Sequence, residues 1–139
     1  MFGATHNRAS AYAKVGVETG VSTADPHRLI LMLYDGALLA ISSASHAMEH
    51  NDVAKKGQSI SRAIEIIANG LDACLDRDAG GELAMRLSAL YEYMTDRLLY
   101  ANLKNNQAAL DEVAELLRGL RESWEAIGEQ VRSGATAQA

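Results

Sequence analysis

Two histidines four residues apart are the first residues in this chain that could do chemistry. His46 and His50 would share one face of a helix with Glu49 beside them, so both rings could reach one metal ion. A zinc site needs further ligands, and the sequence supplies no second group of cysteine, histidine and carboxylate residues at metal-binding spacing. Two solvated histidines near the C-terminal end of a helix, where positive charge is favourable, explain the pair better. We therefore expect no metal site.

A phosphotransfer role is the second chemistry that these histidines suggest. In a signalling bundle, an exposed helical histidine such as His27 or His46 would accept a phosphoryl group. A nearby lysine and a glycine that gives the response domain access should then follow. The four residues after His46 provide neither. Phosphotransfer is therefore kept only as an alternative.

The single cysteine, Cys74, is expected to lie on the apolar face of a helix as a small buried hydrophobe. No histidine is placed to activate its thiol as a nucleophile. No second cysteine is present for an internal disulfide, which agrees with a reducing cytosol. No catalytic residue, cofactor site or metal ligand emerges from these candidates, so the sequence does not predict an enzyme.

The overall composition favours a helical protein that binds another protein. Of the 139 residues, 48% are apolar, only 5% are aromatic and only one is proline, a profile typical of helical bundles rather than β-rich folds. The formal net charge of −5 argues against a nucleic-acid partner, since phosphates select basic surfaces. No unbroken apolar run approaches the roughly 18 residues of a membrane-spanning helix, and residues 1–10 lack a signal-peptide pattern. No membrane insertion is expected.

Hydrophobic residues repeat at intervals of three and four along four segments. These cover about residues 26–50, 53–76, 82–102 and 107–132, and the pattern predicts an all-α antiparallel four-helix bundle over residues 25–132. Residues 1–24 are small and polar, and we expect a mobile N-terminal arm there, with Tyr12 as its large aromatic residue. Residues 133–139 are expected to form a disordered tail. The positions expected to face inward include, near the helix ends, Val53, Leu83, Ile127 and Val131.

The first predicted helix is apolar on two faces. It begins with a suitable N-cap, Asp25, and with proline at the first helical position, where no N–H is needed. One face carries seven residues that suit the core: Ile30, Leu33, Tyr34, Ala37, Ile41, Ala44 and Met48. A second stripe, roughly opposite, consists of Leu29, Met32, Gly36 and Leu39. A helix with two apolar faces must be covered twice, once by its own fold and once by a partner.

Further apolar residues remain after the inward faces of the other helices are assigned. Ile66 is expected to point away from the core face, beside Arg62 and Asn69, and the third helix leaves Tyr93, Leu99 and Tyr100. Single exposed apolar residues are ordinary, so incidental exposure is the simpler explanation for any one of them. The continuous stripe on the first helix is harder to dismiss. The candidate partner-binding residues, among which Tyr34 is alternatively a core residue, are Tyr12, Leu29, Met32, Tyr34, Gly36, Leu39, Ile66, Tyr93, Leu99 and Tyr100.

A series of short motifs runs along nearly the entire chain. It begins with Tyr12, Asp25-Pro26-His27-Arg28-Leu29-Ile30 and Met32-Leu33-Tyr34-Asp35-Gly36-Ala37. It continues with Ala63-Ile64-Glu65-Ile66-Ile67, Gly80-Gly81-Glu82-Leu83-Ala84, Leu90-Tyr91-Glu92-Tyr93-Met94 and Leu120-Arg121-Glu122-Ser123-Trp124. Each motif alone is mostly helix and core, whereas their order and spacing together are specific and resemble those of the flagellar export chaperones of the FliS type.

The resemblance implies a bundle in the bacterial cytosol whose client is the disordered C-terminal segment of flagellin. Such a chaperone would prevent premature polymerisation of the client and then dock on a component of the membrane export gate. The residues themselves support the first part, because a surplus apolar surface can cover the apolar faces of a client helix. Two alternatives stay open: a histidine phosphotransfer bundle, and a structural bundle that self-associates, for example as a weak homodimer, through its spare apolar face.

Overall fold

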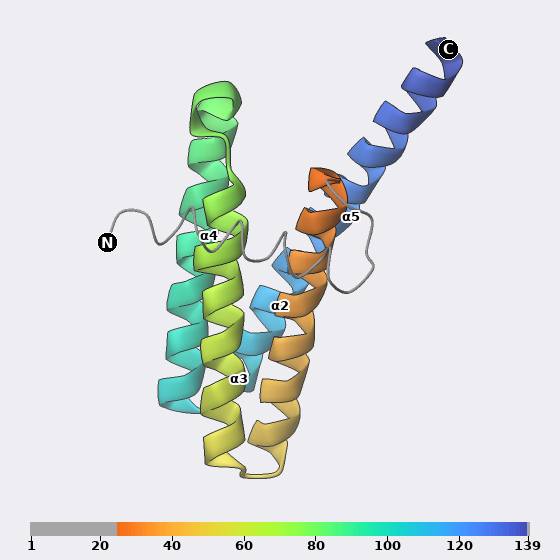
Figure 1. Ribbon diagram of the computed structural model, residues 1–139. Helices are drawn as coiled ribbons and strands as arrows, with labels where there is room; N and C mark the ends of the chain where they lie inside the picture. Colours follow the sequence, from red (N-terminus) through yellow and green to blue (C-terminus); the bar gives the residue numbers. More distant parts are fainter. Residues whose placement is uncertain (1–24, 139) are drawn as a thin grey trace.

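A computed structural model describes residues 25–138 of the chain, and in this part the fold is a bundle of four long helices (Figure 1). Helix α2 spans Pro26–Glu49 and α3 spans Val53–Glu65. The chain then continues through a π-helical turn at Ile66–Leu71 and a 3₁₀ turn at Asp72–Cys74. Helices α4 and α5 span Arg77–Lys104 and Gln107–Gln138. The predicted all-α bundle is confirmed, whereas the predicted arm at 1–24 lies outside the described residues.

The four helices pack in a closed ring of neighbours. Helix α2 packs against α3 and α5, and α4 packs against the same two helices from the other side. Short connections make successive helices antiparallel, so that α2 and α4 run one way and α3 and α5 the other (Figure 1). Each helix therefore has one face toward the centre, and the ends of the bundle and the surfaces between neighbouring helices are where further apolar side chains can be exposed.

Side-chain caps fix all four helix starts, including that of α5, where Asn106 Oδ1 accepts a hydrogen bond from the backbone N–H of Ala109 at 2.8 Å. An Asp25 Oδ1 atom accepts a hydrogen bond from the backbone N–H of Arg28 at 3.3 Å, and Asp52 accepts one from Lys55 at 3.1 Å, which confirms both predicted caps. Asp76 caps α4 in the same way through Ala79, at 2.9 Å. The Asp76 cap starts a helical turn at Arg77 inside the predicted connection 77–81, and Gly81, whose φ and ψ are not helical, separates that turn from the rest of α4.

Two helix boundaries differ from the expectation for physical reasons. The break predicted at the paired glycines survives only as a kink at Gly81, whose φ of 51° lies in the left-handed region that glycine tolerates. Helix α5 was expected to end near residue 132 but continues to Gln138. Ala135, Ala137 and Gln138 are good helix formers, and in the structure the helix runs on through Ser133, Gly134 and Thr136, which favour helix less.

The core is a single apolar cluster contributed by all four helices. Its largest fully buried side chains are Ile60, Ile67, Leu71, Met94, Leu98, Leu110, Val113 and Leu117. The seven predicted inward residues of α2 are buried, except for Ile30, which packs on the cluster as a partly buried residue. One polar pair lies inside: the hydroxyl groups of Tyr34 and Tyr91 are 2.7 Å apart and share a hydrogen bond. Tyr34 is therefore a core residue.

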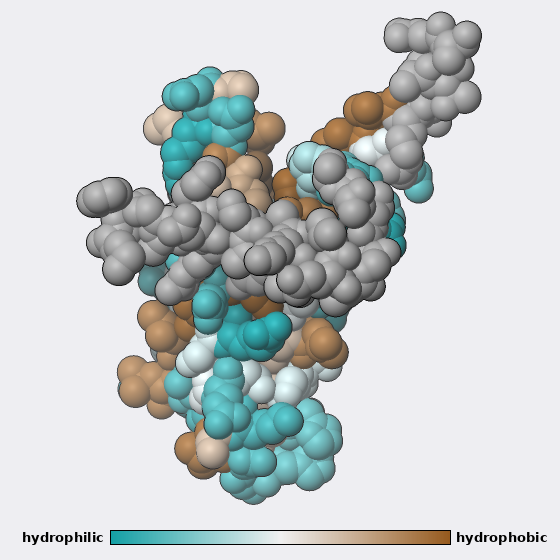
Figure 2. Space-filling view, viewed as in Figure 1, coloured by the Kyte–Doolittle hydropathy of each residue, from teal (hydrophilic) through white to brown (hydrophobic). Residues whose placement is uncertain are grey.

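Four residues expected to face inward are exposed. These are Val53, Leu83, Ile127 and Val131, each with more than half of its side chain accessible. They lie in terminal turns, or in the part of α5 that extends past the start of α2 (Figure 1), where no facing helix covers them. Figure 2 shows hydrophobic surface on this extended part of α5. Helical periodicity predicts the direction of a side chain, but burial also needs a neighbour at that level.

The two ends of the bundle are held differently. At the end where α2 meets α3, Lys56 donates from Nζ to the carbonyl oxygen of Asn102 at 3.1 Å and to Oδ1 of Asn105 at 3.0 Å. Gln107 Nε2 donates to the Ser45 hydroxyl at the same end. These bonds tie α3 to α4 and α5 to α2. The opposite end, where α2 begins and α3 passes into α4, carries the exposed apolar residues Leu83, Met85 and Ile127.

Helix α2 also satisfies the length and composition of a membrane-spanning helix, with a mean hydropathy of 1.4 over 18 residues. In the structure it packs against α3 and α5 and buries Leu33, Tyr34, Ala37 and Ile41. The hydropathy of α2 is therefore explained by its place in the core together with its second apolar stripe.

Alkaline pH should destabilise the bundle through its buried phenols. Burial raises the pKa of Tyr34, and burial together with the adjacent Tyr34 raises that of Tyr91, above the ordinary value of 10.0. The folded state thus holds these protons more tightly than the unfolded chain. Their contribution is fully present below about pH 10 and is lost as the pH rises above it. Urea unfolding across this range should show the fall, and the double variant Tyr34→Phe/Tyr91→Phe should show a shallower one. An equally steep fall in that variant would contradict the assignment.

Candidate functional site

A groove between α2 and α3 is the first candidate site. We call it the α2–α3 groove, and its volume is about 350 Å³. Helix α2 contributes Gly36, Leu39, Ala40 and Ser43, and α3 contributes Lys55, Gln58, Ser59 and Arg62. Leu39 is 73% exposed, so a large apolar side chain stands at the edge of the groove without cover from the described residues. The groove therefore joins part of the predicted second stripe to the polar face of α3.

Small side chains let α2 and α3 approach closely below this groove. The hydroxyl of Ser59 donates to the hydroxyl of Ser43 at 3.0 Å across the floor. A Cβ atom on Gly36 would lie 3.4 Å from Cδ1 of Ile66, in van der Waals contact. Gly36 thus lies against Ile66 beneath the groove, at a distance that would also fit a methyl group.

Ile66 is buried, contrary to the expectation from sequence. Its side chain is 3% exposed. The buried residues Ser59, Ala63 and Gly70 lie at helical spacing around it, so α3 buries a second face toward α2 in addition to its core face. The π-helical turn begins at Ile66 and shifts the positions that follow. The signal that could have revealed this face is the run of small residues on either side of Ile66.

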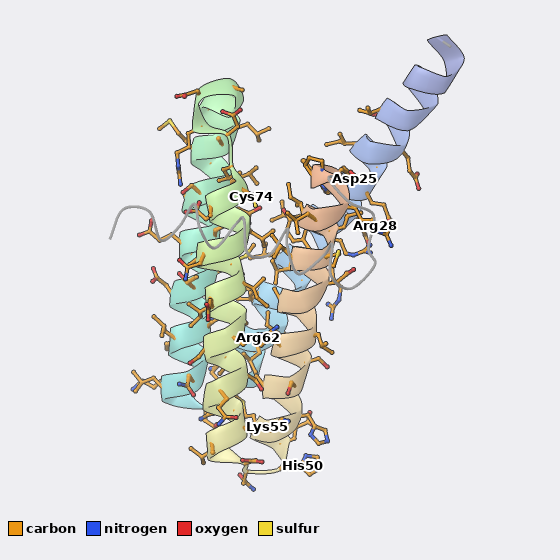
Figure 3. All side chains as sticks on the ribbon, in the orientation of Figure 1. Asp25, Arg28, His50, Lys55, Arg62 and Cys74 are labelled. Atoms are coloured by element: carbon orange, nitrogen blue, oxygen red, sulfur yellow. The ribbon has the colours of Figure 1, made fainter. Side chains whose placement is uncertain are left out.

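A second apolar hollow lies at the end of the bundle where α2 begins. We call it the open-end pocket, with a volume of about 250 Å³. Its apolar lining comes from the start of α2, the π-helical and 3₁₀ turns that follow α3, the first half of α4 and the middle of α5: Ile30, Leu71, Cys74, Leu75, Leu83, Leu87, Tyr91 and Trp124. Burial raises the pKa of the Cys74 thiol, so that the neutral thiol is favoured there. Figure 3 labels Cys74, which lies in the 3₁₀ turn that follows α3.

His27 and Trp124 clasp α2 to α5 beside the open-end pocket. His27 Nε2 donates to the carbonyl oxygen of Trp124 at 2.6 Å, and Trp124 Nε1 donates to the carbonyl oxygen of His27 at 2.9 Å. The two rings stack with centroids 5.0 Å apart. The His27 ring rests on Gly128, where a Cβ atom would come within 2.1 Å of it. His27 is therefore engaged in structure and is not the exposed histidine that phosphotransfer requires.

The outer face of α4 carries the remaining predicted surface residues. Tyr93 donates its hydroxyl hydrogen to Glu112 Oε2, and Arg97 Nε donates to Glu112 Oε1 at 2.8 Å. These two bonds hold the pKa of Glu112 below its ordinary value. The Arg97 guanidinium also lies 4.8 Å from the centroid of the Tyr100 ring. This network joins α4 to α5, so Tyr93 and Tyr100 already have partners within the bundle, whereas Leu99 is exposed.

The predicted partner-binding residues therefore do not form one surface. Leu39 and Gly36 line the α2–α3 groove, while Leu29 and Met32 are partly buried further toward the start of α2. Tyr93, Leu99 and Tyr100 lie on α4, and Tyr34 and Ile66 are in the core. Tyr12 is outside the described residues. Sequence reasoning missed Lys55 and Arg62 as groove residues, because a lone cation on a helix carries no signal until its neighbouring helix is known.

The histidine pair at the end of α2 is compact. The His46 and His50 rings stack with centroids 4.1 Å apart, and His50 Nδ1 donates to the carbonyl oxygen of His46 at 2.8 Å. Within residues 25–138, no group of three or more His, Cys, Asp or Glu side chains is arranged to hold a metal ion. The geometry of the described residues thus offers apolar hollows with polar rims, which suit a protein partner.

Comparison with known proteins identifies the family. The family model described as flagellar protein FliS matches residues 8–131. The chain belongs to this family. A flagellar secretion chaperone FliS from Salmonella typhimurium is 50% identical over 123 residues, covering 88% of this chain and 91% of that protein. The FliS chaperone of Escherichia coli is 46% identical over 114 residues, covering 82% and 84%. FliSB of Pseudomonas aeruginosa is 46% identical over 116 residues, covering 84% and 91%. All three relatives carry the name flagellar secretion chaperone.

The clasp can be tested at the glycine beneath the histidine ring. Gly128→Ala should lower the free energy of unfolding by about 1–3 kcal/mol, because the added methyl group would overlap the His27 ring. Thermal unfolding followed by circular dichroism measures the change.

Gly119→Ala is the matched control, because nothing lies within 4 Å of its added Cβ on the same helix. Alanine is the better helix former, so this control should gain up to about 1 kcal/mol. Adding His27→Ala to Gly128→Ala should recover part of the loss. A Gly128→Ala protein as stable as the control would show that the clasp does not constrain α5.

Proposed function

We propose that this FliS-family protein is a cytosolic export chaperone for flagellin. It binds the disordered C-terminal segment of flagellin, prevents premature polymerisation and helps deliver it to the flagellar type III export apparatus. The observation that supports this most directly is the α2–α3 groove, where Leu39 stands 73% exposed beside the core helix. The names of the relatives, all flagellar secretion chaperones, supply the client class.

Helix-in-groove recognition explains why the protein carries hollows along its helices. An amphipathic client helix can lay its apolar face along a groove such as that between α2 and α3. A disordered segment that folds on binding pays for its ordering by burying roughly 1,000–3,000 Å² of surface. The α2–α3 groove and the open-end pocket lie at different levels of the bundle, so a client must be long enough to reach both. An extended segment with short helices meets this requirement.

The N-terminal arm, residues 1–24, is proposed to cover part of this client surface when the chaperone is empty. The arm joins α2 at Asp25, about one helical turn before Ile30, which lines the open-end pocket. Its scattered apolar residues, Tyr12 among them, suit transient contact with an apolar hollow. Contact with the export gate would follow client loading, and no surface among the described residues is assigned to it.

Client binding is tested by calorimetric titration with a peptide covering the last segment of flagellin from the same bacterium. We expect one-to-one binding with a negative heat-capacity change, because apolar surface is buried. Leu39→Asp should weaken this binding about tenfold or more while the helix content and thermal stability stay near those of the wild type. Absence of binding by the wild type would remove the chaperone proposal and direct attention to self-association.

Ile66→Asp is the matched control for Leu39→Asp. Ile66 is buried beneath the same groove, so a carboxylate there should destabilise the whole bundle by several kcal/mol. Circular dichroism separates the two outcomes. If Leu39→Asp unfolds the protein and Ile66→Asp does not, the assignment of inner and outer faces of α2 and α3 is reversed.

Deletion of residues 1–20 tests the arm. The bundle should stay folded, because the described core lies within residues 25–138. The single tryptophan, Trp124, lines the open-end pocket, so its fluorescence should shift toward that of a more water-exposed indole when the cover is removed. Client affinity or solubility should change as well. Unchanged fluorescence, affinity and solubility would contradict the covering role.

A further inference from the structure

Two cations of α3 stand on one rim of the α2–α3 groove. Lys55 and Arg62 both line it and are seven residues apart. Seven residues are close to two helical turns, so their Cα atoms are separated by about 10.5 Å along the axis on one face of α3. Figure 3 shows Arg62 and Lys55 at two levels of this helix. The facing wall, from α2, contributes Gly36, Leu39, Ala40 and Ser43, which carry no charge.

These two cations differ from most of the arginines of the bundle. Within residues 25–131 no ion pair joins Lys55 or Arg62 to a carboxylate, whereas each of five other arginines is paired: Arg77, Arg86, Arg97, Arg118 and Arg121. The whole chain carries a formal net charge of −5. The groove therefore combines a floor of small side chains, an exposed leucine at its edge and two cations without an ion pair on one side, and its charge is opposite in sign to the net charge of the protein.

We propose that the α2–α3 groove selects an amphipathic client helix that carries carboxylates about two turns apart along one flank. The apolar face of that helix packs on Leu39 and the small side chains of the floor, and its acidic flank faces Lys55 and Arg62. This inference rests on the proposed function and specifies the chemistry of the client segment that occupies this groove. Because the α2 wall is uncharged, the acidic flank of the client helix lies against α3, and its opposite flank lies against α2.

Charges on the rim of a groove mainly accelerate association and select among partners, and they add less to the final affinity. The measured quantity is therefore the association rate of the flagellin C-terminal peptide as a function of salt concentration. The test variant is Lys55→Glu/Arg62→Glu. Both side chains are exposed, and at Lys55, in the first turn of α3, an acidic residue is favourable, so the variant is expected to fold. A charge-neutral version, Lys55→Gln/Arg62→Gln, provides a second measurement should the first prove unstable.

The matched control is Arg86→Glu/Lys104→Glu, which changes the net charge by the same amount at exposed positions of α4 outside the groove. At low salt we expect the groove variant to associate about tenfold more slowly than the wild type, and the control about as fast as the wild type. At about 0.5 M salt, where exposed charges are screened, the rates should converge.

Each outcome decides between the inference and the proposed function. Binding by the wild type with equal association rates for all variants overturns the charged-rim inference and leaves the chaperone function standing. An equal loss in the groove variant and the control assigns the effect to net charge and also overturns it. No binding of the peptide by the wild type overturns the proposed function together with the inference. A flagellin peptide with its carboxylates changed to amides should lose the salt dependence if the inference is correct.

Discussion

The structure depends on one constraint: α2 must bury one apolar face in the core while α3 lies close against its other side. Small side chains make this approach possible, with Gly36 facing Ile66 and Ser43 bonded to Ser59. Because the helices touch over small residues, the larger side chains at the margin are left at the surface. Leu39 is one of them. The same close packing that closes the core therefore creates the groove beside it.

The electrostatic arrangement follows from this packing. Ion pairs such as Asp35 with Arg121 and Glu112 with Arg97 link neighbouring helices around the ring. Exposed pairs of this kind contribute only about 0–1 kcal/mol each to the stability of the fold. Their main effect is to neutralise particular charges within the bundle. Lys55 and Arg62 are left without such a partner among the described residues. These two cations therefore lie beside an exposed apolar side chain, Leu39, at which a partner could bind.

The sequence predicts the fold well and the site only in part. Periodicity and caps identify the four helices, and Asp25 and Asp52 cap them as expected. Ile66 could not be placed, because its burial depends on the small residues of a second helix and on the π-helical turn that it begins. Val131 was expected to face inward but is 66% exposed, in the part of α5 that extends past the start of α2. Arg62 becomes a groove residue only when α2 is placed beside it. Properties that depend on the helix itself are thus predictable, and those that depend on a neighbour are not.

The unequal ends of the bundle have a consequence for its dynamics. At one end, Lys56 is bonded to two groups at the end of α4, and Gln107 is bonded to Ser45. The other end relies on the His27–Trp124 clasp and on a hollow that is only partly filled. Amide hydrogens near the start of α2 should therefore exchange with solvent faster than those near the connection to α3, because less free energy is needed to open the bundle locally at the first end. We therefore expect local opening to begin at the end where α2 begins.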